Sequence, residues 1–108
     1  MERINLKDKL LNRERLFAGW TSLGHSQVTE MLIRSGVDFL GIDIEHSTIS
    51  QEQSQRIIAA CHAFGIPCLP RVASHNPEDI KRLLDSGADG VIVPTVETPE
   101  QVERLIEW

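Results

Sequence analysis

The feature that most constrains the fold is a pattern that recurs three times. In each case a helical segment ends at a glycine, a short apolar run follows, and a polar loop precedes the next helix. The three occurrences are residues 35–43, 64–72 and 86–94. Glycine directly after a helix adopts the left-handed conformation without a Cβ clash, so Gly36, Gly65 and Gly87 are expected helix C-caps. The apolar runs are nearly continuous, which is typical of parallel strands covered by helices, and the pattern predicts an α/β fold.

The expected helix starts are also marked in the sequence. Ser50 and Gln53 have capping-box spacing, in which each side chain satisfies a free backbone N–H of the first turn. Asn76 and Thr98 each stand before a proline followed by acidic residues, as expected for a cap and the first helical position. With an opening strand around residues 16–20, these signals indicate four consecutive βα units.

Two architectures fit four βα units, a small open doubly wound sheet and part of a (β/α)8 barrel. An open sheet that binds a nucleotide usually has a glycine-rich phosphate loop after its first strand, and residues 21–26 contain no such motif. A complete barrel needs roughly 200–250 residues, whereas this chain has 108. We predict one partial-barrel domain over residues 1–108, the N-terminal half of a (β/α)8 TIM barrel. It would consist of an N-terminal helix in residues 1–14 and four βα units in residues 15–108.

Composition excludes several function classes. The formal net charge is −5, aromatic residues make up 5%, and there is no cluster of Lys and Arg, so no nucleic-acid partner is expected. No apolar run approaches the roughly 18 residues that cross a bilayer. The charged start at residues 1–7 lacks an apolar signal core, which predicts a cytoplasmic protein. Cys61 and Cys68 are too few for a disulfide scaffold, and we expect both to be buried apolar thiols.

The most informative segment for chemistry is residues 41–47, Gly-Ile-Asp-Ile-Glu-His-Ser. It places Asp43, Glu45 and His46 at the carboxyl end of a predicted strand, where barrel enzymes have their active sites. Because side chains alternate along a strand, Asp43 and Glu45 would share one face. An imidazole beside carboxylates is suited to act as a general base. The alternative, which the spacing leaves open, is a pair of solvated loop acids beside a surface histidine.

Other candidate residues have equally open interpretations. Arg71 ends the next predicted strand and could bind an anion or form a salt bridge with a loop acid. Asp85 lies in the last turn of a helix, where a negative charge opposes the helix dipole, or it is simply exposed. Trp20 could line a pocket or pack in the core. The other histidines, which we expect at the surface or beside helix caps, are His25, His62 and His75. Glu97 is a possible auxiliary carboxylate or a plain loop acid, and there is no H-E-x-x-H or C-x-x-C metal motif.

Six sequence blocks occur in order from about Phe17 to the end of the chain. They are Gly19-Trp20, Gly36-Val37-Asp38-Phe39, Ile42-Asp43-Ile44-Glu45-His46, Pro70-Arg71-Val72, Ile80-Lys81-Arg82-Leu83-Leu84-Asp85-Ser86-Gly87-Ala88 and Val93-Pro94-Thr95-Val96-Glu97-Thr98. Together they resemble the HpcH/HpaI-type aldolases, a family of metal-dependent class II pyruvate aldolases. D-x-E-H alone is a weak signal, whereas six blocks in this order and spacing are specific.

The resemblance implies reversible aldol cleavage of 4-hydroxy-2-oxo acids to pyruvate and an aldehyde. His46 matches the general base of the family, and Arg71 matches the residue that stabilises the pyruvate enolate. Asp85 matches the acid that raises the basicity of the histidine. Trp20 and Arg71 are expected to bind substrate. No Schiff-base lysine is needed, because a divalent metal chelated by the 2-oxo acid would act as the electron sink.

The implied metal is Mg, Mn or Co, but the chain lacks the family's direct metal ligands. In the family these come from the fifth and sixth strands, so Asp43 and Glu45 would lie near the metal, through water rather than as direct ligands. The chain is therefore expected to be inactive as an isolated half. It is also expected to form a homo-oligomer. The alternative is a non-catalytic half-barrel that self-associates or pairs with a complementary half, because its edges and inner face are uncovered. A phosphate- or sugar-binding barrel fragment is a third possibility.

Overall fold

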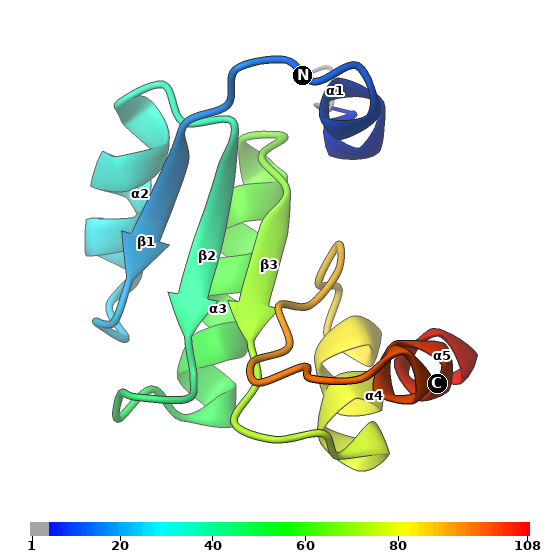
Figure 1. Cartoon of the computed structure of the whole chain (residues 1–108). Helices are drawn as coiled ribbons and strands as arrows, with labels where there is room; N and C mark the ends of the chain where they lie inside the picture. Colours follow the sequence, from blue (N-terminus) through cyan, green and yellow to red (C-terminus); the bar gives the residue numbers. More distant parts are fainter. Residues whose placement is uncertain (1–4) are drawn as a thin grey trace.

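The computed structural model describes residues 5–108 and has an α/β architecture (Figure 1). Its parallel sheet has the order β1-β2-β3, as the sequence predicts. The strands are β1 (Ala18–Thr21), β2 (Phe39–Asp43) and β3 (Cys68–Arg71). The helices are α1 (Leu6–Leu11), α2 (Ser26–Arg34), α3 (Gln51–Ala63), α4 (Pro77–Asp85) and α5 (Pro99–Glu107). Over these residues, no helix combines the length and apolar character needed to cross a membrane.

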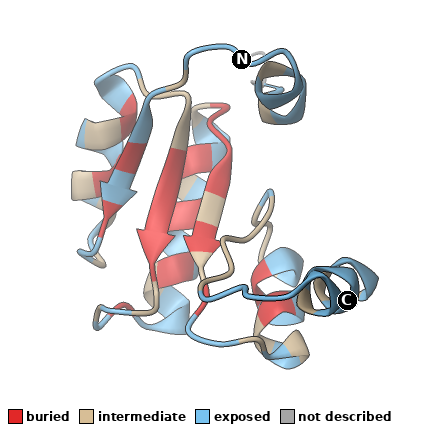
Figure 2. Ribbon diagram, in the orientation of Figure 1, coloured by how far each residue is buried: buried red, intermediate tan, exposed pale blue. Residues whose placement is uncertain are grey.

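The core lies between the sheet and the helices α2 and α3, which cover one of its faces (Figure 1). Leu40 and Ile42 of β2 are 0% exposed and pack with Ile57 and Cys61 of α3. Cys68 is also fully buried, so the prediction of two buried thiols is confirmed. Figure 2 shows that buried residues concentrate in β2, β3 and the facing side of α3. The side chain of Trp20, by contrast, is 44% exposed.

The predicted helix ends and starts are confirmed. Gly36, Gly65 and Gly87 have φ values of 93°, 70° and 101°, which an L side chain rarely adopts. Ser50 and Gln53 form the predicted capping box at the start of α3. The caps predicted before α4 and α5 are also present, each followed by proline in the first turn. These short-range signals position the helices relative to the strands that they follow.

The fourth predicted strand differs from expectation. Within residues 86–94, the structure has one parallel bridge, between Ile92 and Arg71, rather than a regular strand. Asp89 N–H donates to the Cys68 carbonyl and Ile92 N–H donates to the Pro70 carbonyl, so three residues of this segment span two residues of β3. Pro70 also lacks the N–H that would extend the ladder toward this segment. The extra residue and the missing donor leave the segment beside β3 without a continuous ladder.

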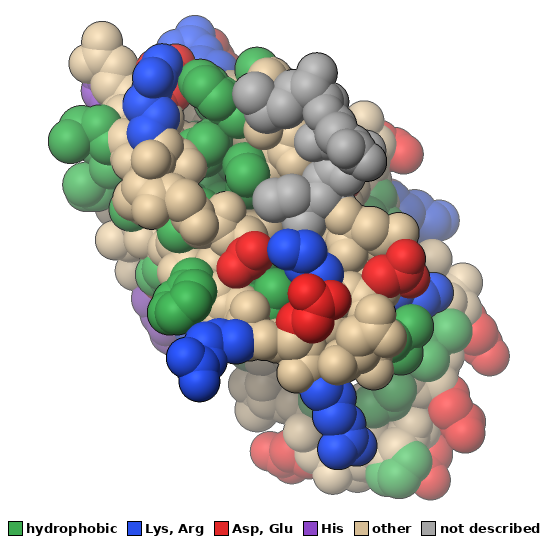
Figure 3. Space-filling view, turned by 90° about the horizontal axis from the view of Figure 1, so that it is seen from above, with side chains coloured by type: hydrophobic (Ala, Val, Ile, Leu, Met, Phe, Trp, Pro, Cys, Tyr) green, Lys and Arg blue, Asp and Glu red, His purple; other side chains and the backbone are tan. Residues whose placement is uncertain are grey.

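At the amino-terminal edge of the sheet, two aspartates bind the preceding strand in the same way. Asp38 Oδ2 accepts the backbone N–H of Phe17 at 2.9 Å, and Asp89 Oδ2 accepts that of Cys68 at 2.8 Å. Both aspartates stand in a Ser-Gly-x-Asp sequence directly after a helix. Lys9 adds an ion pair to Asp38 at 3.2 Å. Figure 3 looks onto this edge, where acidic and basic side chains lie next to one another.

Replacing Asp38 with asparagine should lower the stability of the fold at neutral pH. The N–H of Phe17 and, next, the ammonium of Lys9 hold the pKa of Asp38 below its ordinary value of 3.8. A depressed pKa contributes stability above the unfolded-state pKa, and this contribution is lost as the pH falls through the folded-state pKa. Urea unfolding at pH 7 should therefore show a lower midpoint for Asp38→Asn, and at pH 3 the difference should shrink. Glu103→Gln, at an exposed position of α5, should leave both midpoints unchanged.

Candidate active site

The candidate site lies at the carboxyl ends of β2 and β3. Asp43 and Arg71 are the last residues of these two strands and are partners in the parallel register. Arg71 Nη2 lies 3.0 Å from Asp43 Oδ2. The Asp43 side chain is 9% exposed and that of Arg71 is 27% exposed, so water screens this ion pair only in part. Strand register alone therefore brings together a carboxylate and a guanidinium that are distant in sequence.

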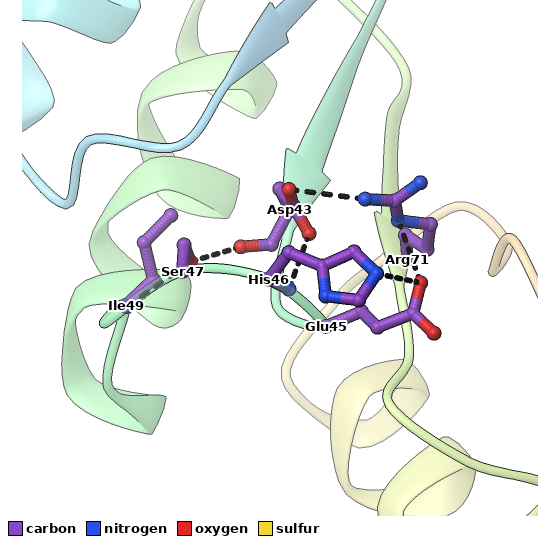
Figure 4. Close-up of polar contacts among 6 residues, drawn as sticks. All are labelled: Asp43, Glu45, His46, Ser47, Ile49 and Arg71. Atoms are coloured by element: carbon purple, nitrogen blue, oxygen red, sulfur yellow. Dashed lines mark hydrogen bonds and ion pairs between the residues drawn. The ribbon is translucent and has the colours of Figure 1, made fainter.

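The loop after β2 turns sharply and directs Glu45 and His46 toward Arg71 (Figure 4). Asp43 Oδ1 accepts the backbone N–H of His46 at 2.9 Å. The hydroxyl of Ser47 donates to the Asp43 carbonyl and accepts the N–H of Ile49. Side chain-to-backbone bonds of this kind replace strand pairing where the chain turns. Ser47 was not among the predicted site residues, although a serine four positions after the strand's last aspartate is a signal of such a turn.

Glu45 joins the two candidate catalytic groups. Its Oε1 atom lies 3.3 Å from His46 Nε2 and 3.3 Å from Arg71 Nε. The imidazole, from the loop after β2, and the guanidinium, from the end of β3, therefore approach the same carboxylate oxygen (Figure 4). The His46 side chain is 71% exposed, whereas Glu45 is 17% exposed. The imidazole is therefore accessible to a ligand, while the guanidinium of Arg71 is only 27% exposed.

Trp20 completes the surroundings of Arg71 from the first strand. Arg71 Cζ lies 5.0 Å from the centroid of the Trp20 ring, within the range of a cation–π interaction. Of the two interpretations open from the sequence, packing in a closed core does not describe a side chain that is 44% exposed. Trp20 instead presents one part of its ring to Arg71 and another to solvent.

The electrostatics of the site keep Asp43 ionised. The backbone N–H of His46 has the largest effect and lowers the pKa of Asp43, the guanidinium of Arg71 lowers it further, and burial of the carboxyl group opposes both. The net result is a pKa below the ordinary value of 3.8. Asp43 is therefore a carboxylate counterion to Arg71 near neutral pH, and it is poorly suited to donate a proton.

The structure does not bring every predicted residue to this site. Asp85 lies exposed in the last turn of α4, beside a surface depression lined by Gln51, Gln55 and Ser86. His25 caps α2 by accepting the N–H of Gln27, as expected for a cap-adjacent histidine. His62 Nε2 lies 3.5 Å from Asp89 Oδ2, and His75 Nε2 lies 2.7 Å from the Pro94 carbonyl oxygen. Glu97 uses its backbone N–H to bind Gln101 in the turn before α5.

The described residues do not fit the direct ligand set of a metal ion. Over residues 5–108, no three His, Cys, Asp or Glu side chains are grouped so that they could hold one. Both Asp43 and Glu45 direct their carboxylates at Arg71, so a cation bound between them would have to displace the guanidinium. That Asp43 and Glu45 lie near a metal through water remains a prediction.

Replacing Arg71 with leucine should destabilise the fold by about 1–3 kcal/mol at neutral pH. Removing one partner of a fully buried ion pair costs about 3–5 kcal/mol, and the partial exposure of Arg71 reduces this figure. The loss should shrink below pH 4, because Asp43 becomes protonated only below its ordinary pKa of 3.8 and then needs no cation. Urea unfolding at pH 7 and pH 3 measures both effects.

Arg56→Leu is the matched control for this prediction. Arg56 pairs with Glu52 at 2.6 Å, but both side chains are about 70% exposed, so its loss should change the free energy of unfolding by less than about 0.5 kcal/mol. Equal losses at the two positions would contradict a special role for the ion pairs of Arg71.

Comparison with known proteins identifies the family. The profile of the HpcH/HpaI aldolase/citrate lyase family matches residues 17–107. A hydroxypyruvate/pyruvate aldolase of Paraburkholderia phytofirmans is 36% identical over 104 residues, covering 94% of this chain and 40% of the relative. The crystal structure of the citrate synthase SbnG matches with a TM-score of 0.88 and 35% identity, covering 96% of this chain and 42% of that one.

A second solved structure agrees with this assignment. An HpcH/HpaI aldolase/citrate lyase family protein from Burkholderia cenocepacia has a TM-score of 0.87 and 32% identity, with 95% of this chain and 41% of that chain covered. The chain thus spans about 40% of the length of these relatives, and its β1-to-α5 order corresponds to the N-terminal half of their barrel. By sequence and by fold, the chain belongs to the HpcH/HpaI aldolase/citrate lyase family.

Proposed function

We propose that this chain supplies part of the active site of a carbon–carbon lyase that cleaves 4-hydroxy-2-oxo acids to pyruvate and an aldehyde, or joins them. The proposal rests on one contact. The Oε1 atom of Glu45 lies 3.3 Å from Nε2 of His46 and 3.3 Å from Nε of Arg71. An accessible base beside a cation is the pair that an aldol cleavage requires. The names of the relatives support the same reaction class.

His46 would remove the proton from the 4-hydroxyl group of the substrate. The bond between C3 and C4 then breaks and the aldehyde leaves. The electron pair of the broken bond remains on the pyruvyl fragment, which becomes an enolate. Arg71 would stabilise the negative charge on the enolate oxygen, because a preorganised guanidinium is most effective where charge develops. Return of the proton from His46 to the enolate carbon then gives pyruvate and restores the neutral imidazole. Trp20, in contact with Arg71, would border the bound 2-oxo acid.

Two further assignments are part of the proposal. Asp85, in the last turn of α4, would support the basicity of His46, in the loop after β2, in the complete enzyme. The divalent metal, Mg, Mn or Co, would take its ligands from groups outside this chain, since residues 5–108 hold no fitting cluster. When bound in the complete barrel, the metal would supply the electron sink at the 2-oxo group.

The proposal is tested by assaying the chain alone and as part of a complete barrel. The 108-residue chain, with pyruvate, an aldehyde and Mg, Mn or Co, should give no turnover above background. A chimera that joins this chain to the unmatched remainder of the Paraburkholderia phytofirmans aldolase should form and cleave 4-hydroxy-2-oxo acids. Ordinary turnover by the chain alone would contradict the expected need for the rest of the barrel, and a folded but inactive chimera would contradict the proposed activity.

A second proposal concerns assembly, because the sheet is covered by helices on one face only in Figure 1. Trp20 on that sheet is 44% exposed, and large exposed apolar groups favour association. We propose that the chain is a half-barrel that pairs with a second copy. Light scattering should then give the mass of a dimer, and a well-folded monomer at micromolar concentration would contradict this.

A further inference from the structure

Gly41, in the middle of β2, has no side chain, and the ring of Trp20 occupies the space that a side chain there would fill. Trp20 of β1 and Gly41 of β2 are direct partners in the parallel register. A Cβ atom on Gly41 would lie 2.4 Å from Cε3 and 2.5 Å from Cζ3 of the indole. Carbon atoms in contact are normally separated by about 3.5–4.0 Å. The indole therefore lies across β2 only because residue 41 is glycine.

The same ring supports a residue on the third strand. Arg71 Cζ lies 5.0 Å from the centroid of the Trp20 ring, and Gly41 lies on the strand between them. A side chain at position 41 would displace the indole from this path. The absence of a side chain at Gly41 thus lets an aromatic ring of β1 contact a cation of β3.

Arg71 contacts one aromatic ring and two carboxylates. Its Cζ atom lies over the Trp20 ring, while Nη2 lies near Asp43 and Nε lies near Glu45. The Nε atom is buried and makes no hydrogen bond with good geometry, so of the two carboxylates only Asp43 makes a close contact with the guanidinium, through Nη2. The remaining nitrogen, Nη1, points away from both carboxylates (Figure 4).

We propose that Gly41 and Trp20 are positioning residues for Arg71. The space at Gly41 admits the indole, and the indole holds the guanidinium so that Nη1 stays available to an oxygen of a bound 2-oxo acid. Only the identity of this ligand rests on the proposed function. The packing role is a property of the three residues themselves, and it can be measured without any turnover.

The test uses the Nε–H resonance of Arg71 in the ¹⁵N-labelled chain, identified by its loss in Arg71→Lys. The ring current of the indole should move this resonance upfield of that of Arg56, an exposed arginine. Trp20→Leu removes the ring and Gly41→Ala displaces it, so both should return the resonance toward that of Arg56. Gly90→Ala is the matched control, because its Cβ would meet Leu69 Cδ2 at 3.0 Å and no atom of the indole.

An unchanged Arg71 resonance in both Trp20→Leu and Gly41→Ala would overturn the proposal. If the backbone amide spectrum shows that Gly41→Ala is unfolded, Trp20→Leu and the double variant Gly41→Ala/Trp20→Leu decide instead. The double variant should be folded, because removing the ring relieves the overlap. A double variant that is still unfolded would show that the cost at Gly41 does not arise from the indole, which also overturns the proposal.

Titration with oxalate, which resembles the enolate of pyruvate, tests the ligand separately. Oxalate should shift the Arg71 resonance in the unaltered chain, and its Kd should rise about threefold to tenfold in Trp20→Leu, as expected for loss of a cation–π contact. An unaltered chain that does not respond to oxalate would contradict the proposed availability of Nη1 to a 2-oxo acid, while the ring-current shift still decides the packing role. An unchanged Kd in Trp20→Leu would show that the indole does not prepare Arg71 for the ligand.

Discussion

In the chimeric barrel, replacing His46 with alanine should lower kcat by about 10²–10⁴-fold, the usual contribution of a positioned general base. The imidazole is 71% exposed and lies 3.3 Å from Glu45 Oε1, so the substitution removes little packing and leaves Glu45 paired with Arg71. KM should change much less than kcat, because the proton transfer belongs to the transition state and not to substrate binding. Steady-state kinetics of cleavage measure both parameters.

His62→Ala is the control for the His46 prediction. His62 is also a partly exposed histidine beside a carboxylate, 3.5 Å from Asp89, but it lies in the last turn of α3, away from the carboxyl ends of the strands. Its replacement should leave kcat within about twofold, since surface substitutions away from a site have small effects. A His46→Ala chimera with unchanged kcat would remove His46 from the mechanism.

Replacing Leu40 with alanine should destabilise the fold by about 2–5 kcal/mol, the usual cost of truncating a buried leucine. Leu40 is 0% exposed, in the middle of β2, and its Cδ1 lies 2.9 Å from where a Cβ on Gly19 would be. Since Gly19 has no side chain to fill the space, the cavity cannot close from that strand. A domain of this size typically has only about 5–15 kcal/mol of total stability, so much of the chain should unfold in mild denaturant.

Met31→Ala provides the comparison for Leu40. Met31 lies on α2, the helix that helps to cover β2, but it is 72% exposed. Its truncation should change the free energy of unfolding by less than about 0.5 kcal/mol. Urea denaturation followed by circular dichroism measures both variants. A Leu40→Ala chain as stable as the unaltered one would mean that the described core does not hold the sheet to its helices.

The sequence predicted the elements well where the signal is short-range. The positive φ angles of Gly36, Gly65 and Gly87 and the capping box at Ser50 follow from groups within a few residues of one another. The fourth strand was the exception. Its apolar run is as clear as the others, but ladder formation depends on the facing strand, where Pro70 has no N–H to donate.

The candidate site was predictable as a set of residues and not as an arrangement. Asp43, Glu45 and His46 could be placed together because they lie within four residues of chain, and the register of two parallel strands adds Arg71. Spacing along the chain gives no distance between His46, in the loop after β2, and Asp85, at the end of α4, so the expected support of His46 by Asp85 stays a prediction. The hydrogen bonds of the Ser47 hydroxyl to the backbone of Asp43 and Ile49 were not predicted, because many serines in loops make no hydrogen bond to the backbone.

The amino-acid sequence by itself determined the alternation of helices and strands, the positions of their caps and the family to which the chain belongs. These depend on local backbone preferences and on the order of short motifs along one chain. Only the tertiary structure decided that one oxygen of Glu45 serves both His46 and Arg71, and that Trp20 crosses Gly41 to reach the same guanidinium. Such contacts join three strands, so they depend on register, on the turn after β2 and on the space left by a missing side chain.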